Sequence, residues 1–465
     1  MLIRVKPIRI LRITFMEKNV GKKESFIIEG LAGQKTLSGS IKVNGAKNAA
    51  LKAFAAAVLF DGAVELKNVP HTSDIDTISS ILEKLGAKVQ GKDSIFKVDT
   101  SMLKSTDIDR ELAAIMRASV VLTGPMLARF GKVTFPAPGG CVIGARHIDL
   151  FLSGYEKMGA VIKLDEKECL YSIEASGGLR GATIDFKKIS VGATETLMMA
   201  AVLAKGKTTL NNCAREPEIV NVAEWLNECG AKISGVGTSV IEIEGTGGKL
   251  LSPAVPFITI PDRIEAGSYL ILGALCAHDL EITNCRPDHL EALTSFLIDA
   301  GVPIQIKKLG ARSLEQGEIR IVGNTNPNSS FKSFTVKTQE YPGFATDLQP
   351  IIAVFLTQVS GKSKIEETIY EGRFKYVEDL VKMGADIKAV DEHQILVKGS
   401  TDFDQLPEGQ ELCAHDIRAG FAIVMAALVG QGSFTVNNVH LIDRGYEKLE
   451  ERLGKLGAKI KRISI

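Results

Sequence analysis

Four positively charged side chains, one at the expected start of a buried helix and three in polar turns, are candidates for chemistry in this chain. They are Lys47 in GAKN, Arg373 in YEGRF, Arg418 in HDIR and Arg444 in IDRGYE. A guanidinium group holds a planar carboxylate or phosphate with two parallel hydrogen bonds, so these residues predict a site for a small anion. The ordinary alternatives are a solvated lysine and ion pairs with the neighbouring Asp416 or Asp443.

One thiol lies in an unusual segment, PAPGGCVIGAR at residues 136–146, where two prolines and three glycines surround Cys141. Proline and glycine at this density disfavour both helix and strand, so we expect a mobile loop. The nearby Arg146 would lower the pKa of the thiol and make it an acid or a nucleophile. The alternative is an inert core cysteine, which is the commoner state.

Three aspartates stand at the starts of apolar segments with helical character: Asp262, Asp347 and Asp416. Aspartate at such a position usually caps a helix, and taken singly each of the three fits that role best. Helix N-termini also attract anions through free N–H groups and the macrodipole. Several of them converging on one cleft would suit a phosphorylated substrate.

The composition is that of an ordinary globular protein with no strong overall charge. Its 465 residues contain 56 Lys and Arg against 55 Asp and Glu, and this near-neutral balance argues against a nucleic-acid partner. The seven cysteines form no CxxC pair and the seven histidines are scattered, which indicates a reducing compartment and no metal site. The apolar runs are too short to cross a membrane, so we expect a cytoplasmic protein.

One phrase returns six times along the chain, in forms such as KLGAKV, KMGADI and KLGAKI. Its glycines lie 71 to 83 residues apart, at Gly86, Gly159, Gly230, Gly301, Gly384 and Gly457. This spacing is too long for a helical solenoid, so each copy is a folding unit of its own. Four copies are preceded by a β-type run that ends in asparagine, at Asn68, Asn212, Asn284 and Asn438.

Each unit is expected to contain two kinds of helix. In the first copy, apolar residues between 75 and 85 recur at helical spacing, with Ser73 as N-cap and Gly86 as a left-handed stop. Upstream lies a helix that is apolar nearly all round, as in NAALKAFAAAVLF, and such a helix belongs in the interior. Because cores stop growing near ~250 residues, six units predict an α/β protein with two domains of three units, divided near residue 260.

Nine motifs in order resemble the UDP-N-acetylglucosamine enolpyruvyl transferases. They are GAKNAAL, MRAS at 116–119, PGGCVIGAR, SVGATET at 190–196, REPEIV at 215–220, PDRIE, FATDLQ, EGRF and IDRGYE. The resemblance runs from about residue 26 to the C-terminus and implies an inside-out α/β barrel in two domains, with three βαβαββ repeats in each. The implied domains are 26–46 with 261–465, and 47–260 carrying the Cys141 loop, after an extension at 1–25 that is expected to be disordered.

The resemblance also implies the reaction. The enolpyruvyl group of phosphoenolpyruvate passes to the 3-hydroxyl of UDP-N-acetylglucosamine and phosphate is released, by addition and elimination through a tetrahedral intermediate. This would be the first committed step of peptidoglycan precursor synthesis and the target of fosfomycin. No metal or organic cofactor is implied, and we expect a monomer or weak oligomer whose partners are these two small molecules.

Residue roles follow from the matching motif positions. Lys47, Arg146 and Arg444 resemble a phosphate clamp, Arg373 and Arg418 carboxylate and closure contacts, Cys141 the loop acid, and Asp347 the base near the sugar hydroxyl. Glu216 and Asp416 fall on supporting acids. The implied nucleotide-sugar contacts are Asn48, Arg117, Arg146, Asp149, Leu150, Lys188, Ser190, Val191, Gly192, Asp347 and Ile369.

Three positions depart from the usual family pattern: Phe151 where histidine is common, Ala345 where proline is common, and Gly372 where asparagine is common. Two alternative functions stay open. The first is the sister activity that makes enolpyruvylshikimate phosphate, against which the GAKN opening and the Cys141 loop argue. The second is an inactive, nucleotide-sugar-binding regulatory paralogue, against which the retained Lys47 and Asp347 argue.

Overall fold

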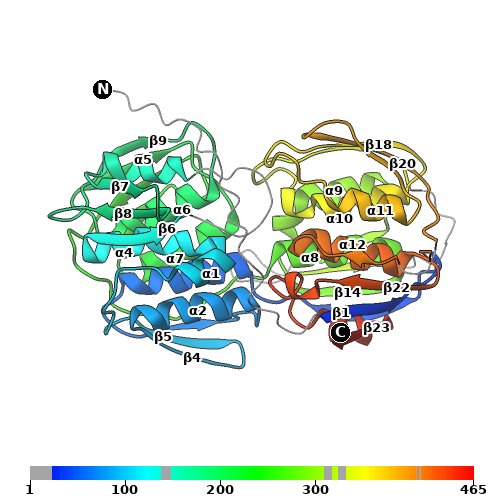
Figure 1. Cartoon of the computed structure of the whole chain (residues 1–465), viewed down its shortest axis with the longest axis horizontal. Helices are drawn as coiled ribbons and strands as arrows, with labels where there is room; N and C mark the ends of the chain where they lie inside the picture. Colours follow the sequence, from blue (N-terminus) through cyan, green and yellow to red (C-terminus); the bar gives the residue numbers. More distant parts are fainter. Residues whose placement is uncertain are drawn as a thin grey trace.

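The computed structural model describes residues 24–137, 148–307, 317–322, 331–404, 406–407 and 410–464. The predicted loop acid Cys141 and the predicted clamp residue Arg146 lie outside these described residues, as does most of the predicted extension. Two lobes of similar size lie side by side (Figure 1). Among the described residues, the helices are all too short or too polar to cross a membrane.

The first lobe contains three small sheets. One has the order β13 (Phe257–Ile258), β3 (Val64–Lys67), β5 (Ile95–Asp99) and β4 (Lys88–Lys92). The second joins β6 (Lys132–Pro136), β8 (Leu170–Glu174) and β7 (Val161–Asp165). The third has the order β11 (Lys232–Ser234), β12 (Val240–Glu244), β10 (Lys207–Asn211) and β9 (Thr183–Asp185).

The second lobe repeats this plan. One sheet has the order β15 (Ile304–Lys307), β16 (Gly317–Ile321), β14 (Ala277–Cys285) and β2 (Leu37–Lys42). The next has the order β17 (Thr335–Lys337), β18 (Gly361–Glu366), β20 (Gln394–Gly399) and β19 (Asp386–Ala389). The last has the order β21 (Leu412–Cys413), β22 (Ser433–Asn437), β1 (Glu24–Glu29) and β23 (Lys459–Ser464). The N-terminal β1 therefore lies between the last strands of the chain, where Figure 1 shows it beside β22 and β23.

The predicted repeat has a clear backbone signature. All six glycines of the repeated phrase adopt a left-handed conformation, with φ from 92° to 109°. The four asparagines that end the β-type runs do the same, with φ from 53° to 60°. Glycine and asparagine tolerate this conformation better than other residues, so the same turn can be built at the same place in each unit. The expected fold class, a two-domain α/β barrel of six repeats, is confirmed.

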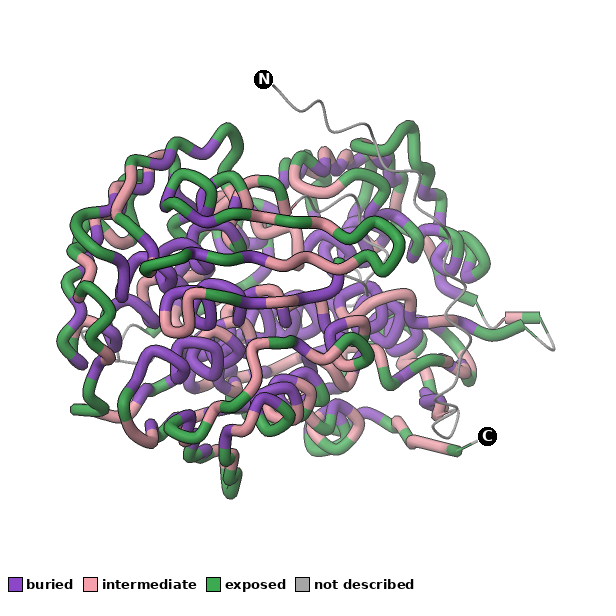
Figure 2. The backbone as a smooth tube through the Cα atoms, turned by 60° about the vertical axis from the view of Figure 1, so that its left-hand side comes forward, coloured by how far each residue is buried: buried purple, intermediate pink, exposed green. Residues whose placement is uncertain are grey.

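The helices divide into the two expected kinds. The buried ones start at the interface between the lobes or pack inside a lobe: α1 (Lys47–Ala56), α4 (Thr123–Phe130), α6 (Val191–Val202), α8 (Arg263–Cys276), α10 (Gln349–Thr357) and α12 (Ile417–Val429). The others are α2 (Ser73–Leu85), α3 (Arg110–Ile115), α5 (Asp149–Lys157), α7 (Pro217–Glu228), α9 (Glu291–Asp299), α11 (Tyr376–Lys382) and α13 (Leu449–Lys455). Figure 2 shows the buried backbone concentrated inside the lobes and the exposed backbone around them.

One local prediction is wrong. Ser73 was expected to cap α2, but it is the first residue of the helix, and Thr72 occupies the N-cap position without a side-chain hydrogen bond. The predicted stop is confirmed, because Gly86 ends α2 with φ 109°. The apolar positions are also confirmed, since Ile75, Ile78, Leu82 and Leu85 are all buried.

Two separate hydrophobic cores fill the lobes. One draws its residues from 46–260, and the other from 26–43 and 264–458. The two chain crossings between the cores pair with each other, because Gly45 and Pro261 form an antiparallel bridge and the Ala46 amide donates to the Ile260 carbonyl at 2.7 Å. We propose that these crossings are the hinge between two domains with the boundaries that the sequence predicts.

Gly45 is the position where this hinge tolerates least change. A Cβ atom added there would lie 1.7 Å from the Asn68 carbonyl oxygen, so the backbones must separate. We expect Gly45→Ala to cost about 1–3 kcal/mol of stability, measured as a lower melting temperature. Gly454→Ala is the matched control, because it lies in α13 with open space around it, and should be neutral or stabilising. An unchanged melting temperature for Gly45→Ala would contradict the hinge geometry.

Candidate active site

The first cluster of the site joins the two lobes through one carboxylate. Lys47 begins α1 and Asp74 lies in the first turn of α2, and the ammonium of Lys47 is 2.9 Å from Oδ2 of Asp74. Arg444 comes from the other lobe, in the turn before α13, and its Nε is 2.9 Å from Oδ1 of the same aspartate. Asp74 therefore holds two cations that belong to different lobes.

The second cluster is built within the C-terminal lobe around Asp347. This residue lies in a short 3-10 turn, η4 (Thr346–Leu348), at the start of α10. Nη1 of Arg373 is 3.0 Å from Oδ1 of Asp347, and Nε of Arg418 is 3.3 Å from Oδ2. Arg418 lies in the first turn of α12, so two helix starts and the turn after β18 meet here.

The two clusters are close enough to interact electrostatically. Arg418 of the second cluster and Arg444 of the first both act on the charge of Lys47. Asp416, beside Arg418, acts on the charge of Arg373. The structure therefore brings together six of the residues predicted from the sequence: Lys47, Asp347, Arg373, Asp416, Arg418 and Arg444.

These cations are buried, and two of them have donors to spare. Lys47 is 6% exposed, Arg373 4% and Arg418 3%. Among the described residues, Nη1 of Arg418 and Nε of Arg373 have no hydrogen-bond partner. Because an unsatisfied buried donor is costly, these atoms are suited to a ligand that brings its own acceptors.

Burial and charge shift the pKa values of the first cluster. Burial of the Asp74 carboxyl would raise its pKa, but Lys47 and Arg444 outweigh this effect and hold the pKa below its ordinary value. Burial lowers the pKa of Lys47, with Asp74 acting against the shift and Arg418 adding to it. The aspartate therefore stays ionised. Burial destabilises the charged form of Lys47, and an anionic ligand would stabilise it.

The roles expected for the three helix-start aspartates are partly corrected. Asp262 caps α8 by accepting from the amides of Ile264 and Glu265, and Asp416 caps α12 in the same way. Asp347 does not occupy an N-cap position, since the caps of η4 and α10 fall at Ala345 and Leu348, and its carboxylate pairs with two arginines. The alternative that paired the arginines with Asp416 or Asp443 is wrong as well, since their partners are Asp347 and Asp74.

The predicted nucleotide-sugar residues lie mainly at helix starts of the first lobe. Asn48 is in α1, Arg117 begins the 3-10 helix η2 (Arg117–Leu122), and Asp149 and Leu150 begin α5. Around the start of α6, Lys188 precedes the helix, Ser190 caps it by accepting from the Ala193 amide at 3.2 Å, and Val191 and Gly192 are its first residues. Ile369 follows β18 in the other lobe. Helix α6 contacts both α5 and η2, so these three elements pack together in the first lobe.

One other predicted site residue, Glu216, lies elsewhere. Glu216 is in a second contact between the lobes, where it accepts from the Tyr341 amide at 3.3 Å, and burial raises its pKa. Beside it, Glu218 pairs with Arg263 across the lobes at 3.1 Å. Phe151 is 4% exposed and packs edge-on against Tyr155, so this departure from the family pattern is a core residue.

Asp74 is a residue of the candidate site that sequence reasoning missed. An acidic residue in the first turn of a helix is favourable for the helix dipole, and this common role conceals any other. Its place in the repeat could have pointed to it. It lies at the start of α2, the helix that follows β3 and the Asn68 turn, and this turn packs against Gly45 of the hinge. Its partner Arg444 lies 370 residues away in sequence.

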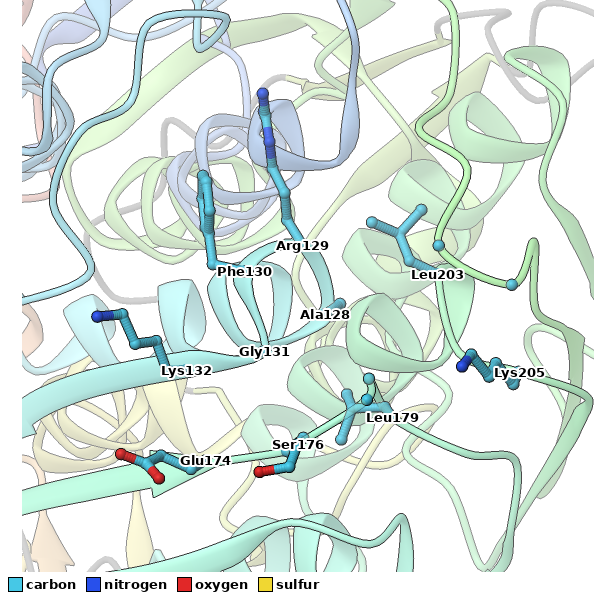
Figure 3. Close-up of a pocket in the computed structure, with 15 residues that line it drawn as sticks. Ala128, Arg129, Phe130, Gly131, Lys132, Glu174, Ser176, Leu179, Leu203 and Lys205 are labelled. Atoms are coloured by element: carbon cyan, nitrogen blue, oxygen red, sulfur yellow. The ribbon is translucent and has the colours of Figure 1, made fainter.

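A surface pocket of about 500 Å³ in the first lobe is lined by none of the residues of the two clusters. It is lined by the end of α4, the end of β8 and the glycine pairs Gly177–Gly178 and Gly247–Gly248. Figure 3 shows that its charged side chains, among them Arg129, Lys132 and Lys205, point in different directions. Within the described ranges, no group of three or more His, Cys, Asp or Glu residues is arranged to hold a metal ion.

We predict that Asp74→Asn destabilises the protein by about 3 kcal/mol at neutral pH, because Lys47 and Arg444 lose a buried counter-ion. The pKa of Asp74 is depressed in the folded protein, so its contribution is present above the ordinary carboxyl pKa and is lost as the pH falls below about 4. The difference in urea midpoint between wild type and variant should therefore be constant from pH 8 to 5 and shrink in acid.

The matched control is Asp279→Asn, which breaks an exposed pair with Arg320 and should change the midpoint little. A difference for Asp74→Asn that is the same at pH 7 and in acid would contradict the proposed role of this charge.

Comparison with known proteins shows to which family the chain belongs. The family model described as EPSP synthase (3-phosphoshikimate 1-carboxyvinyltransferase) matches residues 31–453. The UDP-N-acetylglucosamine 1-carboxyvinyltransferase of Halothermothrix orenii is 44% identical over 93% of this chain and 99% of its own length. The protein of the same name from Campylobacter hominis is 41% identical over 93% and 98%.

Solved structures show the same fold. The enolpyruvyl transferase NikO from Streptomyces tendae superposes with a TM-score of 0.83 at 24% identity, covering 96% of this chain and 100% of that one. An EPSP synthase from Acinetobacter baumannii gives 0.71 at 16% identity, covering 95% and 100%. The chain belongs to the enolpyruvyl (1-carboxyvinyl) transferase family, in which its similarity extends over nearly the full length of UDP-N-acetylglucosamine 1-carboxyvinyltransferases.

Proposed function

We propose that this protein transfers the enolpyruvyl group of phosphoenolpyruvate to the 3-hydroxyl of UDP-N-acetylglucosamine and releases phosphate. The observation that carries the proposal is the convergence of Lys47, Arg373, Arg418 and Arg444, which come from both lobes and are balanced by two aspartates. Phosphoenolpyruvate carries a phosphate and a carboxylate, so it requires this density of cations. The acceptor is proposed from the names of the relatives.

The donor would be held at its two charged ends. Lys47 and Arg444 would bind the phosphate, with Arg146 joining them from outside the described residues. Arg373 and Arg418 would bind the carboxylate, because each has a buried nitrogen free of partners in the described part of the chain. A ligand bound in this way replaces the acceptor atoms that Asp74 and Asp347 provide in the free protein.

The chemical step follows from this placement. The sugar 3-hydroxyl loses its proton to a base as its oxygen attacks carbon 2 of phosphoenolpyruvate, and carbon 3 takes a proton from an acid, which gives a tetrahedral intermediate. Loss of a proton from carbon 3 then expels phosphate and restores the double bond. We assign the acid to Cys141 and the base to Asp347, whose carboxylate already lies at the border of the site and is partly exposed.

The nucleotide sugar would lie along the starts of α1, α5 and α6. Free amides at helix starts favour an anionic pyrophosphate, and Gly192 leaves open space at the start of α6. Closing the lobes would then exclude water from the intermediate, and Arg444 already crosses between them to Asp74. The product would serve peptidoglycan precursor synthesis in the cytoplasm.

The decisive assay measures phosphate release from phosphoenolpyruvate with two acceptors. We expect release with UDP-N-acetylglucosamine and none with shikimate 3-phosphate or without an acceptor. Release with shikimate 3-phosphate alone would establish the sister activity instead. Binding of UDP-N-acetylglucosamine without release would identify an inactive nucleotide-sugar-binding protein.

Arg418→Lys tests the carboxylate contact. A lysine ammonium keeps the charge but cannot form two parallel hydrogen bonds, so we predict a KM for phosphoenolpyruvate raised about tenfold or more. Arg320→Lys is the control, because Arg320 forms an exposed pair with Asp279 and belongs to neither cluster. An unchanged KM in Arg418→Lys would remove Arg418 from the donor site.

A further inference from the structure

Glu367 is a fully buried carboxylate with no role in the proposed chemistry. It directly follows β18 and is 0% exposed. Oε1 accepts from Thr338 Oγ1 at 2.9 Å and from the amides of Ile369 and Tyr370 at 2.8 and 3.1 Å. Oε2 accepts from Thr346 Oγ1 at 2.8 Å. Four neutral donors thus satisfy both oxygens, and burying a carboxylate for a purely structural purpose would be expensive.

Four of the other five repeats carry an asparagine at this place, and the second repeat has Ala137 after β6. The residue directly after the equivalent strand is Asn68, Asn212 or Asn438, and Asn284 lies at the end of β14. Three of these asparagines donate to the backbone carbonyl that follows the neighbouring parallel strand, at Thr259, Phe186 and Val43. The asparagine therefore ties two strand ends together in these repeats.

In the fifth repeat the same bridge is made with the donor and acceptor exchanged. The residue that follows the parallel strand β17 is Thr338, and its hydroxyl donates to Glu367. An asparagine here could form this bridge between strand ends and nothing more. The glutamate forms the bridge with one oxygen, and its second oxygen accepts from Thr346, the neighbour of Asp347.

The second oxygen begins a chain of contacts into the site. Thr346 donates to Glu367 and accepts from Nη1 of Arg373 at 2.9 Å. The same Nη1 is 3.0 Å from Asp347. The amides that Glu367 holds belong to the turn that carries Ile369 and leads to Arg373. One carboxylate thus fixes the turn of the proposed base and the turn of the proposed carboxylate contact.

We propose that Glu367 is a positioning residue that sets the distance between Asp347 and Arg373, and with it the alignment of the sugar hydroxyl against the donor. This inference rests on the proposed function. Glu367 acts through Thr346 and the 369–370 amides, because both of its carboxylate oxygens already accept from protein donors. Where four repeats have an asparagine, this repeat has a carboxylate whose second oxygen contacts Thr346.

The test is the kinetics of Glu367→Gln, which keeps the side-chain volume but replaces one accepting oxygen with a donor. We expect kcat to fall and the KM values of both substrates to rise, with kcat/KM lowered about 10-fold to 100-fold, because a misplaced reacting group costs rate steeply. Glu366→Gln is the matched control, since Glu366 is the preceding residue and pairs only at the surface with Lys364.

Thr346 separates positioning from simple destabilisation. Thr346→Val removes the link and should reproduce the loss, while Thr346→Ser keeps the hydroxyl and should retain wild-type kinetics. The double variant Glu367→Gln with Thr346→Val should lose no more than either single variant, because both break the same chain. If Glu367→Gln fails to fold, the two Thr346 variants decide the question.

Wild-type kinetics in Glu367→Gln or in Thr346→Val would overturn the inference while leaving the proposed function intact. A lower melting temperature with unchanged kcat and KM would also overturn it, because that result is the mark of a structural role alone. A wild-type protein without acceptor-dependent phosphate release would instead overturn the proposed function, and the positioning role with it.

Discussion

The contact of Asp74 with both Lys47 and Arg444 is the interaction on which the rest of the site depends. Buried cations from two lobes repel each other, and each would cost several kcal/mol without a counter-ion. A single ionised carboxylate at 2.9 Å from each of them makes the arrangement stable and holds the lobes in register. Asp347 does the same for Arg373 and Arg418. The cations of the proposed site are therefore held in place by protein carboxylates.

The repeat explains how a chain of this length reaches such a geometry. Each unit places a buried helix behind a small sheet, and the turn between strand and helix is set by a left-handed asparagine or glycine. The helix starts of several units then meet where the lobes face each other, which brings Lys47 and Arg418 together although they lie far apart in sequence. A fold built from six similar units can change one position, as at Glu367, without disturbing the others.

Much of this was predictable from the sequence because it is local and periodic. The glycine spacing predicted six units, the asparagines marked the strand ends, and the arginines in polar turns belong to the clusters that we propose as the anion site. The partners of those arginines were not predictable: Asp74 is 370 residues from Arg444, and Asp347 is 71 residues from Arg418. Such pairs depend on tertiary structure, while a local pattern offers only nearby acids such as Asp416 and Asp443. Glu367 was missed because its meaning appears only when the repeats are superposed.

The central claim is that two cation clusters from two lobes form one site for a doubly anionic donor. A crystal structure of the protein with phosphoenolpyruvate and a non-reacting analogue of UDP-N-acetylglucosamine tests it most directly. The account predicts the phosphate within hydrogen-bond distance of Lys47 and Arg444, and the carboxylate against Arg373 and Arg418. A donor bound elsewhere, with the Asp74 and Asp347 pairs undisturbed, would contradict it.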